Sequence, residues 1–223
     1  MVSEPPPYPR IPRLAAEQDL GDDLVLAPGD AATLLQRLVA VEEKLDGTNV
    51  SLWARDRTVA VALRSGSTGM DRGNQLGPLK AWAGEHSDQL LQIMEDGTVL
   101  YAEWLFWTHS IAYDSLPSHL IGVDLWHPDR GFARVDQRNE RLARAGVPIP
   151  PELFRGVARD LATLGRLPER SRVGSELMEG VVLRSQGGEA PRIAKLLRSG
   201  FERLGDEEWR RGRPRNLLTY GEA

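Results

Sequence analysis

The stretch KLDGTN, residues 44–49, stands between two runs of residues that are typical of β-strands. Residues 38–42 precede it, and from Asn49 to Arg55 apolar and polar side chains alternate. A lysine on a loop at a strand edge is open to a ligand, and a glycine lets the backbone approach that ligand closely. The stretch therefore predicts a ligand site between two strands, although a β-turn with a solvated lysine would show the same pattern.

Composition limits what the rest of the chain can be. The 223 residues are 41% hydrophobic and 27% charged, which is ordinary for one globular domain. The absence of cysteine excludes disulfide scaffolds, thiolate zinc sites and thiol catalysis. We find no signal peptide and no run of 18 apolar residues, so we expect a cytoplasmic protein without membrane contact. Only three of the 28 basic residues are lysines, which makes each lysine a candidate for chemistry.

Strand and helix patterns interleave along the chain and predict an α+β fold with antiparallel sheets and flanking helices. The proline-rich residues 1–14 predict an extended arm, residues 15–198 one domain, and residues 199–223 a charged C-terminal extension. We predict a short helix or the start of a strand at 31–39, strands at 49–55, 58–64, 98–106, 120–126, 181–184 and 193–197, and helices at 78–94, 135–145 and 152–164.

Three further charged residues interrupt strand-like apolar runs. Glu103 lies within Tyr-Ala-Glu-Trp, Glu179 begins Glu-Gly-Val-Val-Leu-Arg, and Lys195 lies within Ile-Ala-Lys-Leu-Leu. A charged group in an apolar strand is costly unless it is paired or functional. Each alone also fits a strand end whose charge reaches solvent, but together with Lys44 they form an ordered set.

That ordered set resembles the covalent nucleotidyltransferases, which include ATP-dependent DNA ligases, RNA ligases and capping guanylyltransferases. K-x-D-G is followed by Arg64, Y-x-E, V-D-L, E-G-V-V and a lysine strand. The longer form K-x-D-G-T-N, the opening YPRIPRL at residues 8–14 and the run at 103–117 resemble the RNA ligase branch, particularly its phage RNA-nick-sealing type and bacterial members. The resemblance covers roughly residues 8–198.

The resemblance implies a nucleotidyltransferase (ATP-grasp-like DNA/RNA ligase) domain that uses ATP and magnesium or manganese. Lys44 matches the nucleophile that forms a lysyl-AMP intermediate. Matches to the family's ATP-binding residues are Glu43 for the adenine edge, Glu103 for the ribose, Arg64 and Lys195 for the phosphates, and Glu179 for the lysine amine and the metal. Asp46 and Asn49 lie on the same loop and are further expected ATP contacts.

Two positions depart from the family pattern. The strand at 120–125 has no aromatic residue to stack on adenine, so Leu120 or Val123 is expected to provide an aliphatic contact instead. The last motif has the single Lys195 in place of two lysines. The missing aromatic residue predicts weaker ATP affinity or a looser base preference. The single lysine predicts weaker catalysis if the second lysine donates a proton as pyrophosphate leaves, because an arginine cannot replace it in that role.

Basic residues gather at the C-terminal end. Residues 192–215 hold eight basic and four acidic side chains in a chain of net charge −4. This segment predicts contacts to a nucleic-acid backbone, although a solvated charged helix fits equally well. The expected nucleic-acid contacts are Arg198, Arg210, Arg211, Arg213 and Arg215.

The sequence therefore predicts an ATP-dependent RNA ligase that acts in RNA repair and joins 5′-phosphate and 3′-hydroxyl ends, with an end-healing protein as a possible partner. Two alternatives remain open. One is a protein that transfers nucleotidyl groups without sealing strands, and the other is a degenerate ligase fold that serves as an RNA-binding or interaction module. DNA ligase activity is the less favoured substrate choice.

Overall fold

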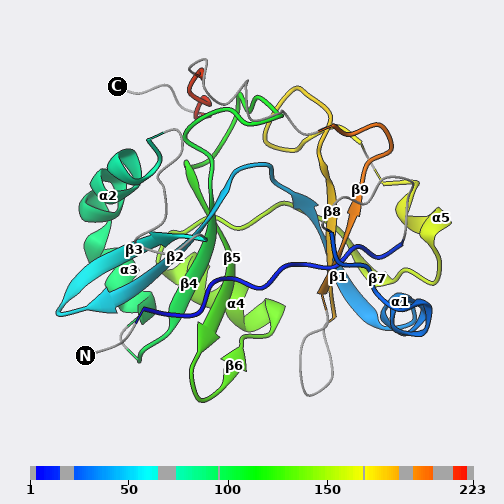
Figure 1. Cartoon of the computed structure of the whole chain (residues 1–223), viewed down its shortest axis with the longest axis horizontal. Coiled ribbons are helices and arrows are strands. Elements are labelled where there is room, and N and C mark those ends of the chain that lie inside the picture. Colours follow the sequence, from blue (N-terminus) through cyan, green and yellow to red (C-terminus); the bar gives the residue numbers. More distant parts are fainter. Residues whose placement is uncertain are drawn as a thin grey trace.

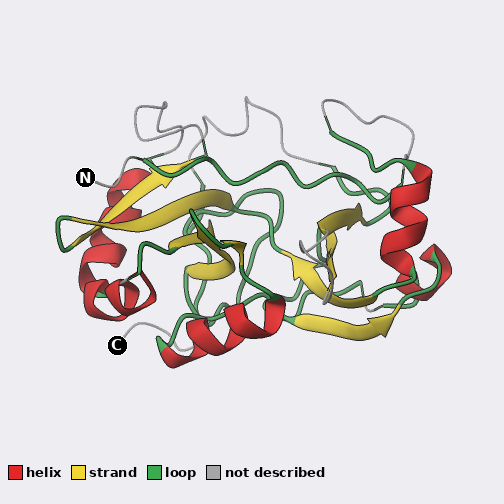
Figure 2. Cartoon of the chain, turned by 90° about the horizontal axis from the view of Figure 1, so that it is seen from below, coloured by secondary structure: helices red, strands yellow, loops and turns green. Residues whose placement is uncertain are grey.

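A computed structural model of the chain describes residues 4–15, 23–64, 74–94, 96–167, 169–185, 193–202 and 213–219. Two antiparallel sheets form its centre, as the alternating patterns predict. Helices lie at both ends of the molecule, with the sheets between them (Figures 1 and 2). None of the helices in these described ranges is long and apolar enough to span a membrane.

The first sheet carries the lysine of the K-x-D-G motif. Its strand order is β7 (Glu152–Val157), β1 (Leu38–Lys44), β8 (Gly180–Ser185) and β9 (Ile193–Leu197). Helix α1 (Pro28–Leu35) begins at a proline, as helices commonly do, and packs Leu34 against Val39 and Val41 in an apolar cluster. This cluster covers one face of the sheet and leaves the face of Lys44 to the site.

The second sheet carries Glu103. Its strand order is β3 (Thr58–Leu63), β2 (Thr48–Arg55), β4 (Val99–Trp104), β5 (Leu120–His127) and β6 (Gly131–Phe132). The helices that accompany this part of the chain are α2 (Leu76–Glu85), α3 (Ser87–Met94) and α4 (Val135–Arg144). Apolar side chains from these three helices pack on one face of the sheet and form its core. Because β1 and β2 belong to different sheets, the motif at residues 44–49 crosses from one sheet to the other (Figure 1).

Two of the predicted helices are wrong in detail. The helix predicted at 78–94 is two helices, α2 and α3, which are separated at His86. The helix predicted at 152–164 is β7 followed by the short helix α5 (Leu161–Leu164). Residues 152–157 pair with β1, where Phe154 and Leu153 pack beside the α1 cluster. Tertiary pairing therefore overrides the helical start expected after the two prolines, because aromatic residues, valine and glycine are poor helix formers.

A buried charged network joins the two sheets. The carboxylate of Glu42 on β1 accepts hydrogen bonds from Arg138 on α4 and from Nε of Arg184 on β8, the latter at 2.8 Å. Nη1 of Arg184 donates to Asp124 of β5 at 2.6 Å, and the hydroxyl of Tyr8 donates to the same carboxylate. The two positive and two negative side chains pair with one another, and buried charges need such pairing to remain out of water.

The described residues of the N-terminal arm, 4–15, run along both sheets. The backbone N–H of Leu14 donates to Lys195 at 2.8 Å, and the N–H of Lys195 donates to Pro12 at 2.9 Å. The hydroxyl of Tyr101 donates to the carbonyl of Pro6 at 2.7 Å. The arm therefore lies against both sheets and fixes the edge of β9 that carries Lys195.

Candidate active site

Lys44 ends β1 and meets Glu179, which directly precedes β8. The Nζ atom of Lys44 lies 2.5 Å from Oε2 of Glu179, and the Glu179 side chain is fully buried. Lys44 is paired with Gly180 in the sheet, which brings the motifs K-x-D-G and E-G-V-V together. A Cβ atom on Gly180 would lie 2.2 Å from the carbonyl oxygen of Leu196, so only glycine permits this close approach of β9.

The K-x-D-G loop is held by the loop that follows β4. Oδ2 of Asp46 accepts a hydrogen bond from the backbone N–H of Ser110 at 2.6 Å, and the N–H of Asp46 donates to the hydroxyl of Tyr113 at 2.8 Å. A Cβ atom on Gly47 would lie 2.7 Å from the carbonyl oxygen of Trp104. The aspartate and the glycine of the motif therefore shape the loop, whereas the lysine reaches into the site.

Glu103 and Asn49 lie side by side on neighbouring strands of the second sheet. They are register partners on β4 and β2, so their side chains share one face. Oε1 of Glu103 accepts a hydrogen bond from the N–H of Gly47 at 3.2 Å. Oδ1 of Asn49 is buried and has no hydrogen-bond partner among the described residues. A buried acceptor without a donor is costly, so the pair fits a ligand that brings hydroxyl groups.

Carboxylates dominate the electrostatics around Lys44. Burial disfavours the charged amine, but the carboxylates of Glu179, Glu103 and Asp46 outweigh it and raise the pKa of Lys44. Burial raises the pKa of Glu103 to about 7. The positive charge of Lys44 lowers this pKa, and the neighbouring carboxylates of Glu179 and Asp46 raise it further. The ligand-free site therefore keeps Lys44 protonated. Lys195, which we expect at the phosphates, is paired with Asp23 in this ligand-free site.

Lys195 binds a residue that the sequence does not single out. Its Nζ atom lies 2.7 Å from Oδ1 of Asp23, and Nε of Arg13 lies 2.7 Å from Oδ2 of the same carboxylate. The pKa of Asp23 is lowered: burial opposes the shift, and hydrogen bonds from Lys195 and Arg13 outweigh it. Asp23 lies in a polar stretch without a recognisable motif, so only the tertiary structure shows the pairing.

Glu43 lies on the other face of β1 from Lys44, by strand alternation. Its carboxylate accepts hydrogen bonds from Oγ of Ser171 at 2.5 Å and from the N–H of Arg172 at 2.8 Å. Burial raises the pKa of Glu43 despite these two bonds. The contact with the adenine edge expected of Glu43 therefore stays a prediction.

Leu120 does not reach the site. It pairs with Trp104 and is fully buried in the core under the helices, whereas Glu103 pairs with Ile121. Register partners in antiparallel strands share a face, so Ile121 lies on the face of Glu103 and Leu120 on the opposite one. Our expectation that Leu120 contacts adenine is therefore wrong. Val123, the other candidate, has no register partner and lies at an irregularity between β4 and β5 that the sequence does not reveal.

Arg64 directly follows β3, and its backbone N–H donates to the carbonyl of Asn49 at 3.1 Å. This bond places Arg64 at the same end of the second sheet as Asn49. The role at the phosphates expected of Arg64 remains a prediction.

His109 is a site neighbour that sequence patterns leave undecided. Its Nε2 atom lies 3.3 Å from Oγ1 of Thr48, and the side chain is buried. Burial, followed by the positive charges of Arg213 and Lys44, lowers the pKa of His109 to about 3. The imidazole is therefore neutral at physiological pH and contacts the strand directly after the K-x-D-G motif.

The described part of the C-terminal segment, residues 213–219, packs on the loop that follows β4. Asn216 is its buried anchor: Nδ2 donates to Leu105 at 2.8 Å, and Oδ1 accepts from the N–H of Tyr113 at 2.9 Å. Arg213 donates to the carbonyl of Thr108 at 2.8 Å, and the Arg215 guanidinium lies 4.6 Å from the ring centre of Phe106. This part of the expected extension therefore belongs to the fold around the site.

Of the five arginines expected to contact nucleic acid, Arg210 and Arg211 lie outside the described residues. Arg198 follows β9, and its backbone N–H donates to the carbonyl of Glu179 at 2.9 Å. Arg198 therefore lies beside the lysine site.

No group of three or more histidine or acidic side chains is arranged to hold a metal ion in the part of the chain that the structure describes. Mg²⁺ is commonly bound by one or two carboxylates together with substrate phosphates and waters. The buried Glu179 carboxylate, 2.5 Å from the lysine amine, fits that mode of binding, in which the nucleotide provides further ligands.

Comparison with known proteins agrees with this geometry. The RNA ligase family model matches residues 37–197. A mutant of the Naegleria gruberi RNA ligase with ATP and Mn has a TM-score of 0.59 and 15% identity, over 87% of this chain and 56% of that one. The same ligase with PPi has a TM-score of 0.55 and 15% identity, over 86% of this chain and 61% of that one.

A structure from Aquifex aeolicus described as an ATP-dependent DNA ligase has a TM-score of 0.51 and 19% identity, over 86% of this chain and 49% of that one. The chain thus spans only part of the length of these structures, which share its fold. No curated protein matches it. Because the family model matches well over half of the residues and includes Lys44, Glu103, Glu179 and Lys195, the chain belongs to the RNA ligase family.

Proposed function

We propose that this protein is an ATP-dependent RNA ligase that forms a lysyl-AMP intermediate on Lys44 and joins 5′-phosphate to 3′-hydroxyl ends. The observation that carries the proposal is the ion pair of Lys44 and Glu179 next to Glu103, within a domain of the RNA ligase family. A lysine surrounded by carboxylates is poised to exchange its proton when a charged substrate arrives.

In the first step the Lys44 amine attacks the α-phosphorus of ATP. A phosphorus–nitrogen bond forms, the bond to the β-phosphate oxygen breaks, and pyrophosphate leaves. The amine must lose a proton first, and the Glu179 carboxylate at 2.5 Å is in place to accept it. A Mg²⁺ or Mn²⁺ ion bound by Glu179 and the phosphates would supply positive charge that favours the neutral amine and offsets charge on the phosphate.

The ribose fits the pair on the second sheet. Ribose hydroxyls can donate to the Glu103 carboxylate and to Oδ1 of Asn49, the buried acceptor that has no partner among the described residues. Lys195 is proposed to contact the phosphates, and it must then exchange its bond with Asp23 for one with ATP. This exchange costs little electrostatic free energy, because a phosphate anion replaces the Asp23 carboxylate as the partner of Lys195.

In the later steps AMP moves from Lys44 to the 5′-phosphate of a polynucleotide, and a 3′-hydroxyl then displaces AMP as the strand is sealed. RNA is the proposed substrate because the K-x-D-G-T-N motif lies within a domain of the RNA ligase family. An RNA-repair role in the cytoplasm, with an end-healing protein as partner, is part of the proposal.

The test is a covalent adduct. After incubation with ATP and Mg²⁺ or Mn²⁺, intact-mass analysis should show one AMP per chain, and peptide mapping should place it on Lys44. Lys44→Ala should form no adduct, whereas Lys80→Ala, which changes an exposed lysine on α2, should form it normally. An adduct that persists in Lys44→Ala contradicts the assignment of the nucleophile.

Sealing is tested separately on nicked RNA and on its all-DNA counterpart, with the RNA sealed faster. An adduct without sealing would favour the alternative of a nucleotidyl carrier. RNA binding without any adduct would favour a degenerate ligase fold that serves as a binding module.

A further inference from the structure

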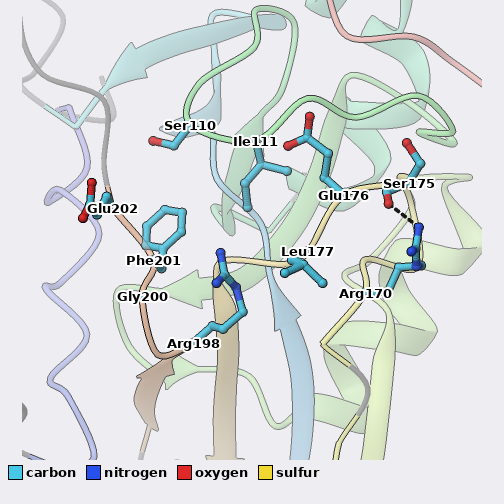
Figure 3. Close-up of a pocket in the computed structure, with 10 residues that line it drawn as sticks. All are labelled: Ser110, Ile111, Arg170, Ser175, Glu176, Leu177, Arg198, Gly200, Phe201 and Glu202. Carbon is cyan, nitrogen blue, oxygen red and sulfur yellow. Dashed lines mark hydrogen bonds between the residues drawn. The ribbon is translucent and has the colours of Figure 1, made fainter.

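A pocket lies beside the lysine site, between three loops that lie outside the K-x-D-G, Y-x-E, E-G-V-V and lysine-strand motifs. Its volume is about 480 Å³, and it is lined by residues 110–111, 170 and 175–177, and 198 and 200–202 (Figure 3). These segments come from the loop after β4, the loop before β8 and the chain after β9. The volume is sufficient for one nucleotide but not for a duplex.

Two walls of the pocket are hydrogen-bonded to segments that carry the residues of the lysine site. On one side, the N–H of Ser110 donates to the carboxylate of Asp46, two residues after Lys44. On the other, the N–H of Arg198 donates to the carbonyl of Glu179. Backbone hydrogen bonds therefore connect two lining residues of the pocket to Asp46 and to Glu179, so the pocket adjoins the segments that carry the Lys44–Glu179 ion pair.

Arg198 is positioned to bind an anion. Its Nε atom donates to the carbonyl of Met178 at 3.1 Å, and Nη1 donates to the carbonyl of Ser199 at 3.1 Å. Carbonyl oxygens orient a guanidinium and leave its positive charge in place. Figure 3 shows this guanidinium between Phe201 and Leu177, where it can meet a phosphate.

Apolar side chains provide the surface for a base. Phe201 is partly buried against the cluster of Leu45 and Ile111, and Leu177 is 44% exposed. In Figure 3 Phe201, Ile111 and Leu177 surround the tip of Arg198. Stacking on an aromatic ring is how proteins commonly hold unpaired bases, whatever their sequence.

The net charge of the pocket lining indicates how long a nucleic acid the pocket can bind. Arg170 and Arg198 are balanced by Glu176 and Glu202 at the pocket rim, so the lining is neutral overall. A groove for a long polyanion would be positive along its course. A neutral lining with an oriented guanidinium at Arg198 fits a single nucleotide, whose base can donate amino protons to a carboxylate.

We propose that this pocket binds one unpaired nucleotide of the RNA strand at the ligation junction, with its phosphate at Arg198 and its base against Phe201. This inference rests on the proposed function, because RNA is the substrate assigned there. It adds a substrate subsite that lies outside the K-x-D-G, Y-x-E, E-G-V-V and lysine-strand motifs.

The experiment uses the full chain after adenylylation with ATP, so that each sealing rate is expressed per mole of adduct. Arg198→Gln keeps an amide donor for Met178 but removes the charge, and Phe201→Leu keeps apolar volume but removes the ring. Arg144→Gln, an exposed arginine on α4, is the matched control. We expect KM for single-stranded RNA to rise about tenfold in Arg198→Gln and several-fold in Phe201→Leu, with the control unchanged.

A second measurement removes the base from the RNA in place of the ring from the protein. An abasic nucleotide at the junction should raise KM in the wild type and have little further effect in Phe201→Leu, because both changes remove the same contact. This non-additivity distinguishes stacking from a general loss of folding.

The outcomes separate the two proposals. Absence of an adduct in the wild type would contradict the proposed function itself. If adducts form but Arg198→Gln and Phe201→Leu seal RNA with the wild-type KM, the pocket is not the subsite. If the abasic nucleotide raises KM by the same factor in Phe201→Leu as in the wild type, the stacking contact is also rejected. If Arg198→Gln fails to form the adduct, the pocket belongs to ATP and not to RNA.

Discussion

Nζ of Lys44 and Oε2 of Glu179 lie 2.5 Å apart, although 135 positions separate the two residues in the chain. Lys44 is the last residue of β1, and Glu179 directly precedes β8. The two strands are neighbours in the first sheet. In the ligand-free protein this pair keeps the Lys44 amine protonated, because the carboxylate stabilises the charged amine. In the proposed reaction, arrival of the substrate and its cation must therefore be coupled to loss of that proton.

Glu179→Gln should lower the pKa of Lys44, since it removes the strongest contribution that favours the charged amine over burial. The measurement is the pH dependence of acetylation at Lys44, followed by mass spectrometry without ATP. The midpoint should move to lower pH in the variant, while exposed Lys80 keeps the same midpoint in both proteins. An unchanged midpoint at Lys44 would show that Glu179 does not control the amine.

Glu103→Gln should change how stability depends on pH. Burial raises the pKa of Glu103 from 4.5 to about 7, so the folded chain holds a proton that the unfolded chain releases. The free energy of unfolding contributed by this group therefore falls as pH rises from about 4.5 to about 7. Urea unfolding of the variant should lack that decline. Glu140→Gln on α4, an exposed position, should keep the wild-type slope.

Arg138→Met should destabilise the fold strongly. Arg138 is fully buried, and the variant leaves the Glu42 carboxylate with only part of its positive partners. Breaking a buried pair in this way typically costs about 3–5 kcal/mol in free energy of unfolding. Arg144→Met breaks an exposed pair with Glu140 and should cost less than about 1 kcal/mol. Equal losses in the two variants would argue against the network as the joint between the sheets.

Asn216→Leu tests the C-terminal segment. The substitution leaves the carbonyl of Leu105 and the N–H of Tyr113 without their buried partners, which should cost about 2–4 kcal/mol. Denaturant unfolding measures this loss, with Leu217→Ala as the control because Leu217 is 61% exposed. An undisturbed Asn216→Leu protein would show that the segment is not an integral part of the fold.

The sequence by itself identified the charged residues of the candidate site. Lys44, Glu103, Glu179 and Lys195 interrupt apolar strand patterns, and a charged residue in such a place is evident without coordinates. Alternation also located most of the strands, because the period of two is a local property. The crossing of the K-x-D-G stretch between two strands followed from the same local signal.

The tertiary structure alone decided which partners these residues meet. Asp23 pairs with Lys195 over 172 positions, and Asn216 with Leu105 over 111, without a local pattern that marks either pair. The strand at 152–157 exists because β1 offers its edge, which outweighs local helix signals. The irregularity opposite Tyr101 and Ala102 accompanies the placement of Ile121, and not Leu120, on the face of Glu103. Register and long-range pairing depend on the whole sheet, so no short stretch of sequence contains them.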